Sequence, residues 1–126
     1  MSQKLIGYCS TFDCDMIDIF KQTPAAYDTV GVGEFKRLLT DERNVLLDVR
    51  TSAEINDNAI PDAIHLDYFS KRFRSSIAAL DRKTTYLVYC RNGGRARKSC
   101  KLMCEMGFTS VIMLKGGMKA WNKAVE

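Results

Sequence analysis

The chain has 126 residues, a formal net charge of +4 and a hydrophobic fraction of 46%, which fits a single globular domain with one core. No apolar run approaches the roughly 20 residues that span a bilayer. No basic stripe with interleaved aromatics indicates nucleic-acid binding. The sequence therefore predicts neither a membrane nor a nucleic-acid partner. Five cysteines are an odd number and cannot all pair within one chain, so reduced thiols in the cytoplasm are expected.

The first part of the chain differs from the rest, and we interpret residues 1–26 as an extension of a domain over residues 27–126. Residues 13–20 are predicted to form a short amphipathic helix. The apolar run at the start is too short for a signal peptide. The sequence is also compatible with a mature form from which a leader peptide has been removed. Cys9 and Cys14 are interpreted as idle thiols, with resolving thiols, a disulfide or metal ligands as alternatives. No second pair stands at metal-ligand spacing, so no metal is expected.

From residue 27 onward, apolar strand-like runs alternate with segments of helical periodicity. Strands are predicted over residues 45–49, 64–66, 84–89 and 110–114, the third being the central one. Helices are predicted over residues 33–39, 68–80, 96–106 and 118–125. A capping box from Thr51 to Glu54 predicts one more short helix. This alternation predicts an α/β fold with a mostly parallel central sheet.

Several side chains in these elements are predicted to be structural. One face of the 68–80 helix is expected to pack on the sheet through Phe69, Phe73, Ile77 and Leu80. Further core positions are predicted at Cys100, Met103, Cys104, Met106, Met118 and Trp121. The single histidine, His65, is interpreted as buried and hydrogen-bonded. None of these residues implies a cofactor.

The loop that follows the predicted central strand carries the strongest chemical signal. It begins at Cys90 and leads into a helix, whose first N–H groups carry partial positive charge and lack intrahelical partners. A thiol there loses its proton readily, and negative groups are bound by the same amides. Gly93 and Gly94 allow the backbone to curl with its amides inward. Asp48 and Arg50, at the end of a neighbouring strand, are expected at the same edge of the sheet.

Positive charge gathers in and after this loop. Arg91 and Arg95 fall within it, and we interpret them as ligands of a small anionic substrate. For Arg95 an ion pair with Asp48 or Glu54 is an equal alternative. The lysines of the following helix, at positions 98 and 101, either bind the same anion or lie on a solvated face.

Four segments in order resemble the rhodanese-like sulfurtransferases. The segments are residues 46–50 followed by Glu54, residues 59–66, residues 89–95 and residues 114–121. The resemblance extends from Tyr27 to the C-terminus. It implies a rhodanese-like three-layer fold, with helices on both faces of the mostly parallel sheet.

The second of these segments departs from the family pattern. Asn58 and Asp62 stand where the family usually has glycine, and Ala59 stands where it usually has histidine. Asn and Asp tolerate turn conformations better than most residues, so the turn is expected to form.

The resemblance also implies persulfide chemistry. Cys90 would take a sulfur from a small anionic donor such as thiosulfate and pass it to a thiol or cyanide acceptor. The substrate-binding residues implied are Arg91, Asn92, Gly93, Gly94 and Arg95. The supporting residues implied are Asp48, Arg50 and Glu54. No metal and no cofactor are implied.

The sequence is compatible with three alternative functions. Rhodanese-like domains can relay sulfur to or from a protein partner, and the sequence does not separate this role from small-molecule turnover. An inactive interaction module is disfavoured because Cys90 is present. Cysteine-dependent phosphatases and arsenate reductases place five residues between cysteine and arginine, whereas four separate Cys90 from Arg95.

Overall fold

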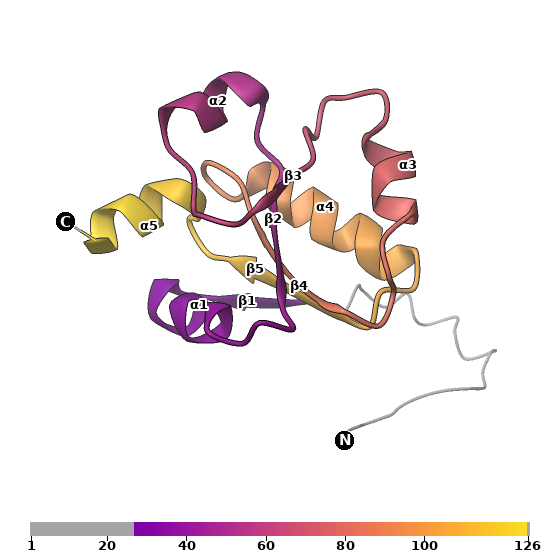
Figure 1. Ribbon diagram of the computed structural model, residues 1–126, viewed down its shortest axis with the longest axis horizontal. Coiled ribbons are helices and arrows are strands. Elements are labelled where there is room, and N and C mark those ends of the chain that lie inside the picture. The colour runs from indigo at the N-terminus through magenta and orange to yellow at the C-terminus, as the bar shows by residue number, and fades with distance from the viewer. Residues whose placement is uncertain (1–26, 126) are drawn as a thin grey trace.

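The computed structural model describes residues 27–125, and its centre is a five-stranded sheet in the order β1-β5-β4-β2-β3 (Figure 1). The strands are β1 (Asp28–Val30), β2 (Val45–Asp48), β3 (Ile64–His65), β4 (Thr85–Tyr89) and β5 (Ser110–Leu114). All neighbouring strands run parallel. The sequence predicts a mostly parallel sheet with the 84–89 strand at its centre, and both predictions are confirmed.

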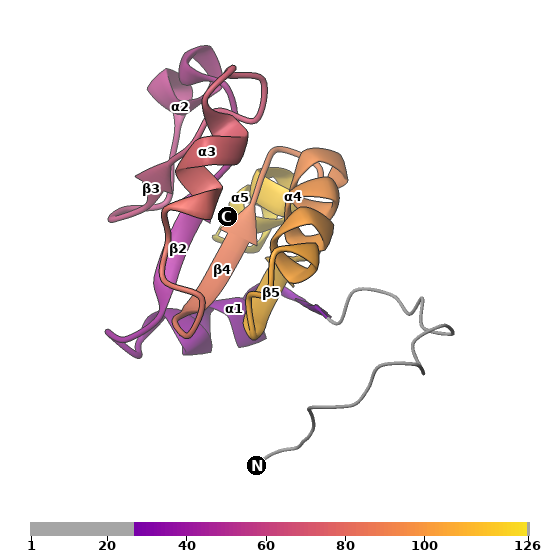
Figure 2. The same ribbon diagram turned by 90° about the vertical axis from the view of Figure 1, so that its right-hand side faces the viewer.

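Helices form a layer on each face of the sheet (Figure 2). They are α1 (Val32–Leu39), α2 (Ser52–Asp57), α3 (Phe73–Ala78), α4 (Gly94–Glu105) and α5 (Gly117–Val125). One buried cluster joins the sheet to α1 and α5, and a second joins it to α3 and α4. The α2 helix lies beyond the carboxyl ends of the strands (Figure 1). This is the three-layer arrangement that the family resemblance implies. No helix within residues 27–125 is long and apolar enough to cross a membrane.

The two buried clusters follow from the side-chain alternation of the central strands. In β2, Leu46 packs towards α1 and α5, whereas its neighbour Leu47 packs towards α3 and α4. In β4, Leu87 belongs to the first cluster and Val88 to the second. A strand that is covered on both faces buries consecutive apolar residues, which explains the unbroken hydrophobic runs in the sequence.

Two predicted helix boundaries are confirmed by hydrogen bonds. The Thr51 hydroxyl accepts a bond from the Glu54 amide, and the Glu54 carboxylate accepts one from the Thr51 amide at 2.9 Å, which completes the capping box. At the end of α4, the Phe108 amide donates to the Met103 carbonyl at 3.0 Å. The Gly107 amide donates to the Cys104 carbonyl, and the two bonds together form a Schellman motif.

The prediction of one helix over residues 68–80 is wrong for its first five residues. The Asp67 carboxylate accepts a hydrogen bond from the Phe69 amide at 2.9 Å, and the Ser70 hydroxyl accepts one from the amide two residues later. These side chains stabilise turns in place of helix, so α3 begins only at Phe73. Phe69 is consequently 68% exposed instead of buried.

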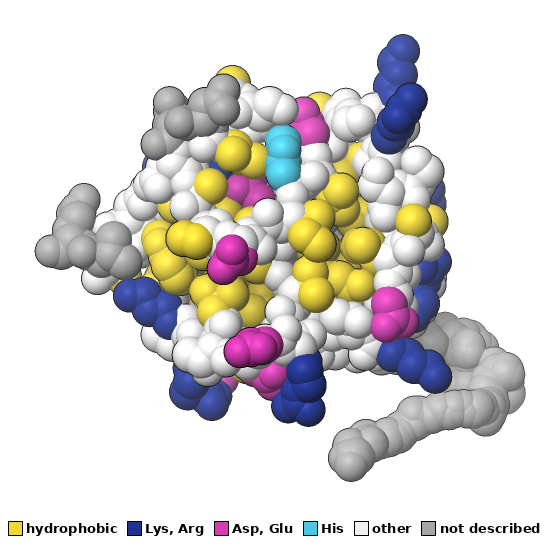
Figure 3. All heavy atoms as spheres, in the orientation of Figure 1, with side chains coloured by type: hydrophobic (Ala, Val, Ile, Leu, Met, Phe, Trp, Pro, Cys, Tyr) yellow, Lys and Arg dark blue, Asp and Glu magenta, His cyan; other side chains and the backbone are white. Residues whose placement is uncertain are grey.

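The prediction that His65 is buried is also wrong. His65 is exposed, because β3 is the edge strand of the sheet. Figure 3 shows this face of the molecule, with the single histidine in cyan. The ring still hydrogen-bonds, with its Nε2 atom 2.7 Å from the Arg50 carbonyl oxygen.

The predicted turn after α2 forms despite the missing glycines. Asp62 adopts a φ angle of +70°, in the left-handed region that Asp tolerates better than most residues. Asn58 has a φ angle of −173°, which is extended backbone open to any residue.

The other core predictions fall into two groups. Cys100, Met103 and Met118 are buried, as predicted. The partly buried residues packed against the two clusters include Leu80, Cys104, Met106 and Trp121. The predictions for residues 13–20, Cys9 and Cys14 lie outside the described residues.

Candidate active site

The Cys90 sulfur lies inside the loop that joins β4 to α4. Its Sγ atom accepts hydrogen bonds from the Gly93 amide at 3.0 Å and from the Ala96 amide at 3.3 Å. Gly93 has a φ angle of +117°, a conformation that residues with a Cβ rarely adopt, so glycine is required there. Gly94, by contrast, has an ordinary φ angle and open space around its Cα. Two backbone dipoles therefore point at the sulfur, which stabilises negative charge on it.

The sulfur is covered, while the loop around it is open to solvent. Cys90 is only 1% exposed. Arg91, Asn92 and Gly94, which follow it in the loop, are exposed. The Cys90 side chain is therefore buried at the foot of a loop whose next residues are exposed.

The first turn of α5 holds the Cys90 loop from the other side. The Met118 amide donates to the Cys90 carbonyl at 2.8 Å, and the Lys119 amide donates to the Arg91 carbonyl at 3.1 Å. Gly117 has a φ angle of +60°, and a Cβ atom there would lie 2.4 Å from the Cys90 carbonyl oxygen. The glycine pair before α5 is thus explained by the close approach of the two backbones.

Arg95 forms an ion pair with Glu54 and not with Asp48. Its two terminal nitrogens donate to the two carboxylate oxygens at 2.7 and 2.9 Å, which links α4 to α2. The Arg95 hydrogen bonds lower the pKa of Glu54 to about 2, although partial burial opposes this. The Phe69 ring lies 5.7 Å from the guanidinium, so an exposed aromatic side chain adjoins the pair.

Asp48, Arg50 and Tyr89 form a buried network behind the loop. The Arg50 guanidinium donates to both Asp48 oxygens, at 3.0 and 2.8 Å, and also to the Asn58 carbonyl. The Tyr89 hydroxyl donates to Asp48 at 2.6 Å and accepts from the Ile60 amide at 3.1 Å. Burial, together with the bond to Asp48, raises the pKa of Tyr89, so the phenol stays protonated. The network fixes the strand ends that carry the loop.

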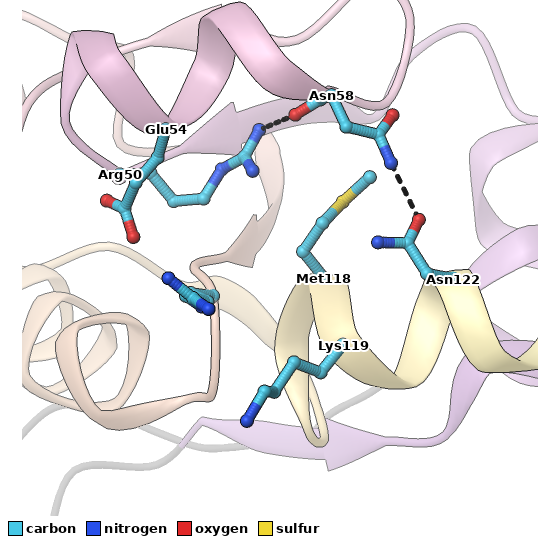
Figure 4. Close-up of a pocket in the computed structure, with 7 residues that line it drawn as sticks. Arg50, Glu54, Asn58, Met118, Lys119 and Asn122 are labelled. Atoms are coloured by element: carbon cyan, nitrogen blue, oxygen red, sulfur yellow. Dashed lines mark hydrogen bonds between the residues drawn. The ribbon is translucent and has the colours of Figure 1, made fainter.

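A cleft of about 210 Å³ borders the loop between α2 and α5 (Figure 4). It is lined by Arg50, Glu54, Asn58, Arg91, Met118, Lys119 and Asn122. Within it, the Asn58 side-chain amide donates to the Asn122 side-chain oxygen at 2.8 Å, which ties the end of α2 to α5. Among the sequence-predicted site residues, Arg50, Glu54 and Arg91 thus meet in one cleft. The lysines at positions 98 and 101 are exposed on α4 and line no part of it.

Sequence reasoning did not assign Lys119 or Asn122 to the site. Met118 and Asn122 stand four residues apart, so they share one face of a helix that begins immediately after a strand end. That spacing was a usable signal, because the carboxyl ends of parallel strands meet at one edge of the sheet.

The fold and the loop together define a class of α/β protein. In this class one cysteine at the carboxyl end of the central strand is held by the amides of the following helix. Among the described residues, no three His, Cys, Asp or Glu side chains gather in a way that could hold a metal ion.

Comparison with known proteins identifies the family. The model of the family described as "Rhodanese-like domain" matches residues 31–124, and the chain belongs to this family. A sulfurtransferase from Allochromatium vinosum is 37% identical over 70% of this chain and 80% of its own length. The thiosulfate sulfurtransferase GlpE of Pseudomonas savastanoi is 32% identical over 71% of this chain and 89% of its own length. These relatives support sulfur transfer as the general activity.

Solved structures agree on the fold. A rhodanese-related protein from Thermoplasma volcanium superposes with a TM-score of 0.69 at 20% identity, over 78% of this chain and 93% of its own. The resemblance in sequence is low, so this comparison establishes the shared fold.

Proposed function

We propose that this protein transfers a sulfane sulfur from a small anionic donor of the thiosulfate kind to cyanide or a thiol, through a persulfide on Cys90. The observation that carries the proposal is the pair of amides, from Gly93 and Ala96, that donate to the Cys90 sulfur. A thiolate and a persulfide anion are both stabilised by such donors. The name of one relative, a thiosulfate sulfurtransferase, supports the choice of donor.

The first half of the reaction loads the cysteine. The Cys90 thiolate attacks the outer sulfur of thiosulfate, and a new S–S bond forms. The bond between the outer sulfur and the sulfonate sulfur breaks, and sulfite leaves with its electron pair. Arg91 is exposed in the loop and lines the adjoining cleft, where it can bind the donor's oxygens.

The second half returns the thiolate. A thiol acceptor attacks the outer sulfur of the persulfide, and the S–S bond to Cys90 breaks with its electron pair left on Sγ. The acceptor's proton ends on the transferred sulfur, so the product is the acceptor's persulfide. With cyanide the same attack gives thiocyanate. No external oxidant or reductant is consumed.

The Arg95 ion pair argues against a phosphatase or arsenate-reductase role. Those enzymes use the arginine at the end of the loop to bind the oxyanion. Here both terminal nitrogens of Arg95 are bound by Glu54, and the loop is one residue shorter. Arg95 is better assigned to bracing α2 against α4.

Phe69 favours sulfur relay to or from a protein as a second candidate function. This aromatic ring is 68% exposed beside Arg95, and aromatic side chains are enriched in protein interfaces relative to the rest of the surface. The relay would use the same persulfide on Cys90.

Intact-mass spectrometry after incubation with thiosulfate tests the proposal. We expect the protein to gain one sulfur atom, to lose it on addition of cyanide, and to release thiocyanate. Cys90→Ser should gain nothing, whereas the control Cys104→Ser, which alters another α4 cysteine, should load normally. Loading from a protein persulfide but not from thiosulfate would favour the relay. Loading that survives in Cys90→Ser, or phosphate-ester hydrolysis in its place, would contradict the proposal.

A further inference from the structure

The cleft between α2 and α5 has features of a binding site for a second substrate. It borders the Cys90 loop directly, since Arg91 lines it and Met118, on its wall, donates its amide to the Cys90 carbonyl. Figure 4 shows the Met118 side chain on α5 reaching towards Asn58 at the α2 side, whereas the Lys119 side chain extends from α5 in the opposite direction. A molecule held there would lie beside the Cys90 loop.

The charges in the cleft favour an anion. Arg50 is neutralised by Asp48, and Glu54 by Arg95. The two remaining cations, Arg91 and Lys119, make no ion pair with any described residue. Within the described part of the chain, the cleft therefore presents two positive charges that no carboxylate balances.

Side chains, and not the helix end, would make the contacts. The amides of Met118 and Lys119 at the start of α5 are already bound by the loop carbonyls. The Asn122 oxygen accepts from Asn58, which leaves the Asn122 side-chain NH₂ as a further donor in the cleft, three residues along α5 from Lys119. The buried Met118 thioether adds an apolar wall for methylene groups.

We propose that this cleft is the acceptor subsite and that it selects thiols carrying a carboxylate. The inference rests on the proposed function. The carboxylate would bind Lys119 and the Asn122 NH₂, the methylenes would contact Met118, and the thiol would reach over Arg91 to the persulfide. The thiol then attacks the outer sulfur, its proton passes to the transferred sulfur, and Cys90 leaves as the thiolate.

A pair of acceptors that differ in charge tests the selection. With thiosulfate as donor, 3-mercaptopropionate should have a KM about fivefold below that of neutral 2-mercaptoethanol, as one exposed charge-assisted contact implies. Lys119→Met should abolish most of this difference and leave the KM for 2-mercaptoethanol within about twofold. Lys123→Met, one turn further along α5 and outside the cleft, should behave as wild type.

A second variant probes the cleft without breaking its internal bond. Asn122→Asp keeps an oxygen that accepts from Asn58, but it replaces the NH₂ donor with negative charge. It should reverse the preference, so that 2-mercaptoethanol becomes the better acceptor. Equal use of both thiols by a wild-type protein that loads sulfur on Cys90 would overturn the subsite alone. Equal effects of Lys119→Met on both thiols would do the same. Failure to load Cys90 at all would overturn the proposed function and the subsite together.

Discussion

The Arg95 guanidinium holds the Glu54 carboxylate with two parallel hydrogen bonds, 2.7 and 2.9 Å long. Because the two residues come from α4 and α2, this pair fastens the segment above the site to the start of the helix that cradles Cys90. Both side chains are about one-fifth exposed, so the interaction is only partly screened by solvent.

This ion pair should give the protein an acid-sensitive component of stability. The pKa of Glu54 is lowered from 4.5 to about 2 on folding, so its contribution is full above pH 4.5 and is lost as the pH falls towards 2. The contribution amounts to about 1–3 kcal/mol. Urea unfolding of wild type and Glu54→Gln should differ by this amount at pH 7, and the difference should shrink between pH 4.5 and pH 2. A difference that is independent of pH would contradict the assignment.

The contact of Gly117 with the Cys90 loop predicts a second effect. Gly117→Ala would place a Cβ atom 2.4 Å from the Cys90 carbonyl oxygen and would also strain a φ angle of +60°. We expect a loss of about 2–5 kcal/mol in the free energy of unfolding, because backbone must move. The matched control is Gly33→Ala in α1, where a Cβ meets nothing within 4 Å. It should stabilise the protein by about 0.5–1 kcal/mol. Equal denaturation midpoints for the two variants would refute the close-packing argument.

Most of the fold could be predicted from the sequence because its signals are local. The capping box of Thr51 and the glycine at position 107 specify helix ends through hydrogen bonds within one turn. The run at residues 45–49 identifies a strand buried on both faces by its composition alone.

The errors came from features that depend on the rest of the fold. The first strand, β1, was not predicted because it has three residues and two of them are exposed. It is held by its pairing with β5, far along the chain. Phe69 matches the helical spacing, but the turn-forming Asp67 and Ser70 override it. The prediction that His65 is buried requires its strand, β3, to lie inside the sheet. The order of the strands places β3 at the edge.

In the candidate site too, the local features were predicted from the sequence and the contacts between distant segments were not. The Cys90 loop was found because its residues are contiguous. The sequence predicts either Asp48 or Glu54 as the ion-pair partner of Arg95 and does not decide between them. Both precede Arg95 by more than 40 residues, so only the folded structure shows which carboxylate lies near it. The cleft side chains on α5 are brought to Arg91 by the packing of a helix from the end of the chain.

The Tyr89 hydroxyl should contribute more to stability than an exposed tyrosine would. Tyr89→Phe removes a bond to Asp48 and leaves the Ile60 amide without its acceptor, in a buried position. The expected cost is about 2–3 kcal/mol in thermal or urea unfolding. The comparison variant on the same strand is Tyr86→Phe, which loses one part-buried bond to the Asp81 carbonyl and should cost about 1 kcal/mol. The prediction is that Tyr89→Phe lowers the free energy of unfolding more than Tyr86→Phe does. A larger decrease for Tyr86→Phe would contradict it.

Arg91 should act on the donor half of the reaction. Its side chain is exposed in the loop next to Cys90 and makes no ion pair with a described residue, so it is available to an anionic donor. Arg91→Ala should raise the KM for thiosulfate about three- to tenfold, since one solvent-exposed charge contact is lost. Its thermal stability should stay close to that of wild type.

Arg97 provides the matched control, because it is exposed on α4 and lines no part of the cleft. Arg97→Ala should leave the KM for thiosulfate unchanged. Raised salt should weaken thiosulfate binding in wild type and in Arg97→Ala, but much less in Arg91→Ala, because screening acts on a contact that this variant has already lost. If both arginine variants raise the KM equally, the effect comes from the net charge of the surface, and Arg91 has no specific role in binding the donor.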